Sequence, residues 1–335
     1  MNTPVETPRD TATPVSFTPE QVAQRIAALR AQVGHAFIGQ PQVFEQVLLA
    51  LLAAGHVLIE GVPGLGKTLL VRALASAVGG SFGRVQFTPD LMPSDVTGHA
   101  IYDMKAERFQ IRRGPVFANL LLADEINRAP AKTQAALLEA MQENQVTIEG
   151  RRFPLPQPFM VVATQNPIEQ EGTYALPEAQ LDRFLVKVQI DYPALADETR
   201  MVTEVLGGQV AADLDVSRVA AVMNEAGLIA IQRMVASLRV DHEVVDYAVR
   251  IARATREWPG VMTGAGPRGG LALIRLARAA ALLDGRDFVT PDDVRGVAIP
   301  ALRHRIVLAP EALIDGQHVE DILKGLLHKV PAPRR

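Results

Sequence analysis

The chain has 335 residues, of which 48% are hydrophobic, and its mean hydropathy is +0.12. This is enough apolar material for one large core and a second small one, so two domains are expected. The formal net charge of −3 does not indicate a nucleic-acid-binding protein. The absence of cysteine excludes disulfides, thiolate catalysis and cysteine-based zinc sites.

No targeting segment is expected at the beginning of the chain. Residues 1–16 are rich in Thr and Pro and lack apolar periodicity, so they are expected to form a disordered leader without a secretory signal. The longest apolar run, VLLALLAAG at 47–55, is far shorter than the roughly 20 residues that cross a bilayer. We therefore expect no membrane span and a cytoplasmic location.

Two helices are predicted before the first strand. Thr18, Pro19 and Gln21 offer an N-cap, a proline at the first helical position and a capping-box partner, for a helix that runs to about Val33. A second helix is predicted for residues 41–54. It leads into a short apolar strand, HVLIE at 56–60, directly before a glycine-rich loop.

Strand and helix signals then alternate, which is typical of an α/β fold with a parallel sheet and helices on both faces. Helices are predicted at 67–78 and 131–144. Further strands are predicted at 84–87 (RVQF), 119–123 (NLLLA), 159–164 (FMVVAT) and 184–190 (FLVKVQI). After Pro193 only helical periodicity is found, so a smaller all-helical domain is predicted at 197–330.

Two segments interrupt this alternation. The connection at 88–118 is much longer than an ordinary one. The segment QVTIEGRRFPLPQPF at 145–159 has two short strand signals around Glu149 and Gly150, which predict a hairpin. Both segments are expected to project from the sheet.

The loop GVPGLGKT at 61–68 satisfies the phosphate-binding pattern G-x-x-x-x-G-K-[ST], between a predicted strand and a predicted helix. Glycines let backbone N–H groups approach phosphate oxygens, Lys67 brings charge to the outer phosphates, and Thr68 reaches Mg²⁺. The helix start adds its positive dipole end. A glycine turn used only for packing would not explain Lys67 and Thr68 together. The predicted nucleotide-binding residues of this segment are Gly61, Val62, Pro63, Gly64, Leu65, Gly66, Lys67, Thr68 and Leu69.

Polar residues follow two further strands. Asp124 and Glu125 come after LLLA, and Asn166 comes after VVATQ. Ligands of open α/β sheets bind beyond the carboxyl ends of the strands, so all three are expected to face the glycine loop. Asp124 is the predicted Mg²⁺ partner beside Thr68, Glu125 the group that orients or deprotonates the attacking water, and Asn166 a hydrogen-bond partner of that water or of the terminal phosphate. The alternatives are a solvated Asp-Glu loop and an Asn-Pro turn.

These motifs together resemble AAA+ ATPases, and among them the MoxR family. The matching segments follow the family's order at 37–40 (FIGQ), 61–68 (GVPGLGKT), 120–130 (LLLADEINRAP), 137–143 (LLEAMQE), 163–167 (ATQNP), 176–184 (LPEAQLDRF) and 264–270 (GAGPRGG). The resemblance implies an AAA+ core at 17–193, with a helix-2 insert and a pre-sensor-1 hairpin, and a lid domain at 197–330. In this group the insert and the hairpin lie near the pore or upper face of a ring.

The resemblance also implies roles for residues outside the glycine loop. The residues that would border the adenine are Phe37, Ile38, Gly39 and Gln40. Asn166 would be sensor 1, and Arg183 is similar to the arginine finger that enters a neighbouring subunit's site, a contribution on the order of 10³ in rate. Arg268 resembles sensor 2, which contacts the nucleotide. Surface ion-pair residues are the alternative for both arginines. Arg128 belongs to a matched motif, and none of the three arginines is assigned to its own or a neighbouring subunit's site.

The implied activity is Mg²⁺-dependent ATP hydrolysis in a homohexameric ring, coupled to the remodelling or maturation of client proteins. A partner with a von Willebrand A domain would be a separate chain. One alternative is a nucleic-acid motor, in which Arg112–Arg113 and Arg151–Arg152 would contact phosphates. The slightly acidic charge and the lack of a helix-turn-helix or zinc motif make nucleic acid the weaker hypothesis. A magnesium-chelatase-like motor subunit is the other alternative.

Overall fold

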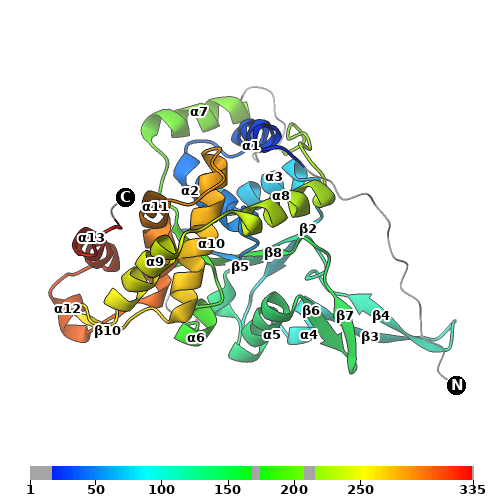
Figure 1. The fold of residues 1–335 in the computed structure, drawn as a ribbon. Helices are drawn as coiled ribbons and strands as arrows, with labels where there is room; N and C mark the ends of the chain where they lie inside the picture. Colours follow the sequence, from blue (N-terminus) through cyan, green and yellow to red (C-terminus); the bar gives the residue numbers. More distant parts are fainter. Residues whose placement is uncertain (1–16, 168–173, 207–215, 334–335) are drawn as a thin grey trace, which may run out of the picture.

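The computed structural model describes residues 17–167, 174–206 and 216–333, so the predicted leader at 1–16 lies outside the described residues. A five-stranded parallel sheet with the order β2-β5-β8-β1-β9 forms its centre (Figure 1). The strands are β1 (Val57–Glu60), β2 (Phe82–Gln86), β5 (Leu120–Asp124), β8 (Met160–Gln165) and β9 (Val186–Gln189). All five were predicted, with ends that differ by one to a few residues.

Both faces of this sheet are buried, which explains the continuous apolar runs of its strands. Leu120 and Leu122 of β5 belong to one hydrophobic cluster, while Leu121 and Ala123 belong to a second. All four side chains are fully buried. The alternation of the strand therefore sends successive residues into two different cores.

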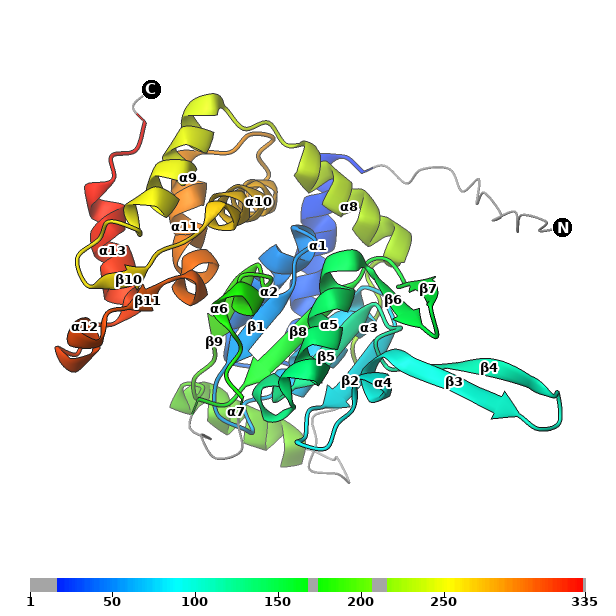
Figure 2. The ribbon, with the colours of Figure 1, turned by 90° about the horizontal axis from the view of Figure 1, so that it is seen from below.

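Helices cover each face of the sheet, as predicted (Figure 2). One face carries α1 (Pro19–Gly34), α2 (Pro41–Leu52) and α3 (Lys67–Ala77), and the other carries α4 (Pro93–Thr97) and α5 (Ala131–Glu143). The predicted capping box of α1 is confirmed: the Gln21 backbone N–H donates to Thr18 Oγ1, and the Thr18 N–H donates to Gln21 Oε1. The expected α/β fold class is thus present.

Two hairpins project from the core. The long connection contains α4 and an antiparallel hairpin of β3 (Gly98–Asp103) and β4 (Arg108–Arg113), which extends far from the sheet in Figure 2. No element was predicted there: GHAIYD in β3 does not alternate, and the alternation of RFQIR in β4 was missed. The second hairpin, of β6 (Gln145–Ile148) and β7 (Arg151–Pro154), turns at Glu149 and Gly150 as predicted. Both turn residues have positive φ, 47° and 73°.

The remainder of the chain is mainly helical. Its helices are α6 (Glu178–Leu181), α7 (Leu195–Leu206), α8 (Glu225–Ser237), α9 (His242–Ala254), α10 (Pro267–Leu283), α11 (Pro291–Leu302), α12 (Pro310–Ile314) and α13 (Val319–Lys329), with a 3₁₀ turn at Arg303–Arg305. A further 3₁₀ turn, at Ile126–Arg128, follows β5 in the core. The expectation that strands stop after Pro193 was wrong in one detail, since β10 (Val261–Thr263) pairs antiparallel with β11 (Val307–Leu308). Strands of three and two residues are too short for any periodicity.

The C-terminal helices contact the core directly. Gln232 of α8 donates to the Leu51 carbonyl at 2.7 Å, and Arg275 of α10 donates to the Ala53 and Ala54 carbonyls at 2.6 and 2.9 Å. The Leu51 carbonyl also accepts the Ala54 N–H at 3.1 Å, and Ala53 and Ala54 directly follow the last residue of α2, where carbonyls lack the usual helical donors. Two helices that follow the sheet in sequence therefore complete the end of a helix that precedes it. In the part of the chain that the structure describes, no helix is long and apolar enough to cross a membrane.

Candidate nucleotide-binding site

The glycine loop at 61–68 joins β1 to α3 at the carboxyl end of the central strands. Gly64 and Gly66 have φ of 86° and 77°, a left-handed conformation that favours glycine. A Cβ on Gly61 would lie 2.5 Å from the Ile190 carbonyl oxygen, so this close approach also requires glycine. Because α3 begins at Lys67, the N–H groups of its first turn have no helical acceptor and lie at the end of the loop. The loop therefore has the tight turns and the open helix start that a phosphate cradle would need.

Lys67 lies within this cradle. Its ammonium donates to the Gly61 carbonyl. Burial lowers the pKa of Lys67, while the charges of Asp124, Glu125 and Glu60 raise it in opposition. A partly desolvated cation beside open backbone amides fits the outer phosphates of a nucleotide.

The FIGQ segment lies against the glycine loop. A Cβ on Gly66 would be 3.6 Å from the Phe37 ring, so the ring covers this glycine. Gly39 has a φ of 83°, and Gln40 donates from Nε2 to the Asp191 carbonyl at 2.9 Å. Phe37 and its neighbour Ile38 are buried. The segment thus packs between the phosphate loop and the end of β9, where the resemblance places the border of a base.

Asp124 and Glu125 meet Thr164 at the carboxyl ends of β5 and β8. The Thr164 hydroxyl donates to Asp124 Oδ1 at 2.7 Å and accepts from the Glu125 backbone N–H at 2.9 Å. Thr164 is almost fully buried, and Glu125 has a left-handed backbone with φ of 55°. One hydroxyl therefore orients both acidic residues. Sequence reasoning missed this threonine, although a hydroxyl near the end of an apolar strand, VVAT, could have indicated it.

Three more side chains hold the two carboxylates. Arg84 of β2 pairs with Asp124 Oδ2 at 2.8 Å. Gln86 of the same strand donates to Glu125 Oε2 at 2.8 Å, and Arg128 donates to the same oxygen at 3.0 Å. Arg84 and Gln86 are two residues apart in a strand, so they share one face. Both of these hydrogen bonds to Glu125 end on the same oxygen, Oε2.

Asn166 follows β8, the strand between β5 and β1. It is 9% exposed, and the neighbouring Gln165 carbonyl accepts from the Gly61 N–H at 3.2 Å. The structure therefore brings Asn166 to the same rim as the glycine loop and the two acidic residues.

Thr68 and Asp124 offer one hydroxyl and one carboxylate for a metal ion. No group of three or more His, Cys, Asp or Glu side chains that could hold a metal occurs at 17–167, 174–206 or 216–333. Mg²⁺ is usually bound by one or two protein oxygens together with substrate phosphates and water. The available oxygens fit that pattern and do not fit a metal cage built by the protein alone.

Arg183 and Arg268 lie near the amino ends of the central strands, on the side of the sheet away from the glycine loop. Arg183 follows α6, next to the fully buried Phe184, and Leu185 donates from its N–H to the His56 carbonyl at 2.8 Å. His56 precedes β1, whereas the glycine loop follows it, and a four-residue strand spans about 13 Å. Arg268, in the first turn of α10, is on the same side, 3.7 Å from Asp182 Oδ2. Neither arginine stands beside the glycine loop of its own chain.

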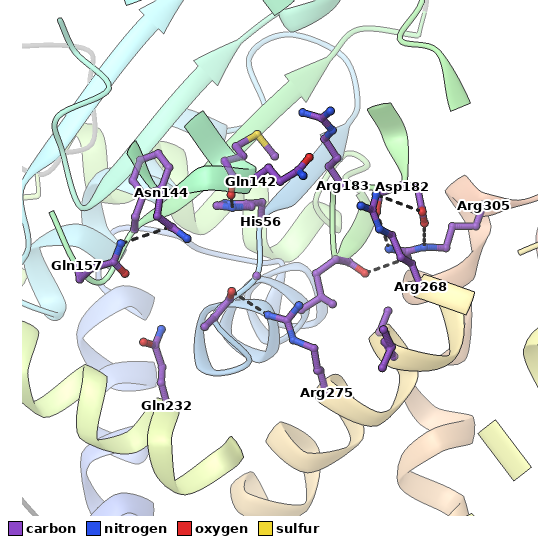
Figure 3. Close-up of a pocket in the computed structure, with 17 residues that line it drawn as sticks. His56, Gln142, Asn144, Gln157, Asp182, Arg183, Gln232, Arg268, Arg275 and Arg305 are labelled. Atoms are coloured by element: carbon purple, nitrogen blue, oxygen red, sulfur yellow. Dashed lines mark hydrogen bonds and ion pairs between the residues drawn. The ribbon is translucent and has the colours of Figure 1, made fainter. Parts of the chain in front are cut away.

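A cavity of ≈ 470 Å³ opens near these amino ends of the strands (Figure 3). Four of its lining residues are Arg183, Arg268, Arg275 and Arg305. His56 also lines it, and the ring accepts the Val161 N–H at Nδ1 and contacts the Met141 carbonyl through Nε2. Burial lowers the pKa of His56 to about 4, so the ring is neutral at pH 7. The cationic character of the cavity therefore comes from its arginines.

Comparison with known proteins identifies the family. The profile of the "ATPase family associated with various cellular activities (AAA)" matches residues 56–186, and that of the "AAA lid domain" matches residues 253–326. The chain is 46% identical to "Chaperone MoxR1" of Mycobacterium tuberculosis over 90% of its length and 81% of that protein. It is also 46% identical to the uncharacterized protein YeaC of Bacillus subtilis, over 90% of this chain and 92% of the other.

A solved structure agrees with these matches. A crystal structure from Cytophaga hutchinsonii superposes with a TM-score of 0.87 at 38% identity, and covers 94% of this chain and 97% of the other. "Protein MoxR" of Methylorubrum extorquens is 33% identical over 92% of this chain and 95% of its own length. The chain therefore belongs to the MoxR family of AAA+ ATPases.

Proposed function

We propose that the protein hydrolyses ATP with Mg²⁺ and uses the energy to remodel or mature client proteins. The observation that carries the proposal is the meeting of the Lys67 loop with Asp124, Glu125 and Asn166 at the carboxyl ends of three adjacent strands, β1, β5 and β8. Strand ends of this kind are where ligands bind in open α/β sheets. A cation, open backbone amides and a pair of carboxylates are the groups that phosphoryl transfer requires.

Each residue has a role that follows from its place. The glycine loop and Lys67 bind the phosphates, and the segment 37–40 borders the base. Thr68 and Asp124 hold Mg²⁺, which neutralises charge on the phosphate oxygens. Glu125 orients the attacking water and accepts its proton, and Asn166 hydrogen-bonds the water or the terminal phosphate. Thr164 holds the Asp124 carboxylate and the Glu125 backbone in place through its hydroxyl.

The proposal includes assembly into a ring, taken as a homohexamer from the resemblance. Arg183 and Arg268 lie across the sheet from their own glycine loop, so they are suited to a site on a neighbouring copy. Among the residues that the structure describes, the Arg183 guanidinium makes no ion pair or hydrogen bond, and it extends away from the Asp182 cluster in Figure 3. An arginine in this position can stabilise the charge that develops during phosphoryl transfer.

A chaperone role is favoured over the alternatives. The relative in Mycobacterium tuberculosis carries the name chaperone, and the chain has a net charge of −3, which disfavours a nucleic-acid motor. The proposal includes a cytoplasmic location and a separate partner with a von Willebrand A domain. A magnesium-chelatase-like motor would use the same ATP site, so the identity of captured partners distinguishes the two.

Two variants test the proposal. Lys67→Ala should lose ATP binding, because it removes the cation of the phosphate cradle. Glu125→Gln should retain ATP and hydrolyse it poorly, and it should hold client proteins long enough for a pull-down. ATP binding and phosphate release with and without Mg²⁺ are the measurements. Wild-type protein that neither retains nor hydrolyses Mg-ATP under any assembly condition would refute the proposal.

A further inference from the structure

Asp182 lies between the loop that carries Arg183 and the helix that carries Arg268. Its carboxylate makes two contacts of different strength: Oδ1 pairs with Arg305 Nε at 2.7 Å, and Oδ2 lies 3.7 Å from Arg268 (Figure 3). Asp182 itself immediately precedes Arg183. One carboxylate thus contacts two arginines of the C-terminal part and adjoins a third in the core.

Arg305 ties this segment firmly to the C-terminal part. Only 4% of its side chain is exposed. Besides the Asp182 carboxylate, its guanidinium donates to the backbone carbonyls of Asp182, Phe184 and Leu185 at 3.3, 2.7 and 3.3 Å. The neighbouring His304 also contacts the Phe184 carbonyl, at 2.9 Å. The backbone on both sides of Arg183 is therefore fixed by one buried side chain.

The start of α10 packs against the same arginine. A Cβ on Gly269 would lie 3.7 Å from Arg305 Cδ and 3.0 Å from the Ala265 Cβ, so the first turn of α10 packs closely here. Burial lowers the pKa of Arg305, and the hydrogen bond and charge of Asp182 raise it in opposition. The charged pair is thereby retained in a buried place.

The contact of Asp182 with Arg268 is different. The Arg268 side chain is 53% exposed, and 3.7 Å is long for a hydrogen bond. Exposed ion pairs of this kind contribute little, so a phosphate group with more charge can displace the carboxylate at low cost. The Arg305 contact, buried and short, would remain.

We propose that Asp182 is the positioning residue of the subunit boundary: through Arg305 it fixes the loop that presents Arg183, and it pairs weakly with Arg268 until a neighbour's phosphate replaces it. This rests on the proposed function, in which both arginines act on ATP bound by the adjacent copy. Asp182 itself touches no reacting atom. Its loss should weaken the site of the neighbour and leave the glycine loop of the same chain intact.

The test variant is Asp182→Asn, which keeps an oxygen acceptor on the side chain. It also leaves in place the three backbone carbonyls to which Arg305 donates. Turnover should fall by about tenfold or more, because small displacements of a positioned group are costly. ATP binding by the glycine loop should stay within about twofold of wild type, since the binding groups are unchanged. The matched control is Asp246→Asn, which removes the exposed carboxylate paired with Arg250 and should leave turnover unchanged.

Mixed rings separate presentation of the arginines from damage to the ATP site. Asp182→Asn subunits keep a complete glycine loop, while Lys67→Ala subunits keep an intact Asp182, Arg183 and Arg268. A mixture should therefore recover turnover that neither variant has alone. Unchanged turnover in Asp182→Asn, or a loss that Lys67→Ala subunits do not restore, would overturn the inference.

A parallel mixture of Arg183→Ala with Lys67→Ala distinguishes the inference from the proposed function. If this mixture recovers and the Asp182→Asn mixture does not, only the role of Asp182 is wrong. If neither recovers although rings form, the action of the arginines across the boundary fails.

Should Asp182→Asn not assemble, Arg305→Lys replaces it in the same mixtures, since lysine keeps the charge and loses the planar fork. Its turnover should also fall and be restored by Lys67→Ala subunits, and the opposite result refutes the inference.

Discussion

Thr164 is the buried hydroxyl on which the geometry of both acidic residues depends. Replacing it with valine keeps the shape of the side chain and removes only the hydroxyl. The variant loses the hydrogen bond to Asp124 at 2.7 Å and leaves the Glu125 N–H without its acceptor at 2.9 Å. No cavity forms, so the effect measures hydrogen bonding and not packing.

The expected loss of stability is the sum of two contributions. A hydrogen bond to a charged group contributes about 1.5–3 kcal/mol, and a buried N–H without a partner costs about 1–3 kcal/mol. Because the Glu125 side chain is partly exposed, we expect a total near the lower end, about 3 kcal/mol. Turnover should fall by roughly tenfold to a hundredfold, since Asp124 and Glu125 lose their common support.

The free energy of unfolding of Thr164→Val, measured by urea denaturation, and its ATP turnover are the two assays. Thr164→Ser is the matched control: it keeps the hydroxyl, and it should retain most of the turnover and lose only about 1 kcal/mol of stability for the missing methyl group. If Thr164→Val unfolds like wild type and hydrolyses ATP at the wild-type rate, the hydroxyl does not orient the acidic pair, and the assigned geometry is wrong.

Three further predictions follow from individual contacts. Because burial lowers the pKa of His56 to about 4, its unfolded form binds the extra proton between about pH 6.5 and 4, so stability falls by up to about 3 kcal/mol as the pH drops through that window, and His56→Gln should flatten the pH dependence of the unfolding midpoint. Arg275→Met should lower the free energy of unfolding by about 1–2 kcal/mol, because the Ala53 and Ala54 carbonyls lose their donor, and Arg275→Lys should restore part of it. Phe109→Ala in the projecting hairpin should change stability by no more than about 0.5 kcal/mol, because the ring is 73% exposed, and a larger loss would show that it supports the core.

The sheet and the phosphate loop could be predicted from sequence for local reasons. Each buried strand is an apolar run. The helix that starts at Lys67 follows a loop in which the backbone geometry requires glycines, so the loop marks where the helix begins. The capping box at Thr18 and Gln21 is likewise a contact between residues three apart. Features that depend on near neighbours in the chain are therefore the ones that sequence reasoning reached.

The missing features depend on which strands lie side by side. Arg84 and Gln86 reach the acidic pair only because β2 pairs with β5 in the register that sets Gln86 opposite Asp124. Asp182 reaches Arg305 across more than a hundred residues of chain. No local pattern marks such residues, because their partners are chosen by the tertiary fold. The roles of Arg183 and Arg268 stay predictions, since their proposed partner is a neighbouring copy.

The central claim is that one chain binds ATP and the next chain supplies the arginine that completes the site. An equal mixture of Arg183→Ala and Lys67→Ala subunits tests it most directly. With random assembly, about one boundary in four joins an intact glycine loop to an intact arginine, so turnover should rise from near zero to about a quarter of the wild-type rate. Assembled mixed rings that stay as inactive as either variant alone would contradict the account.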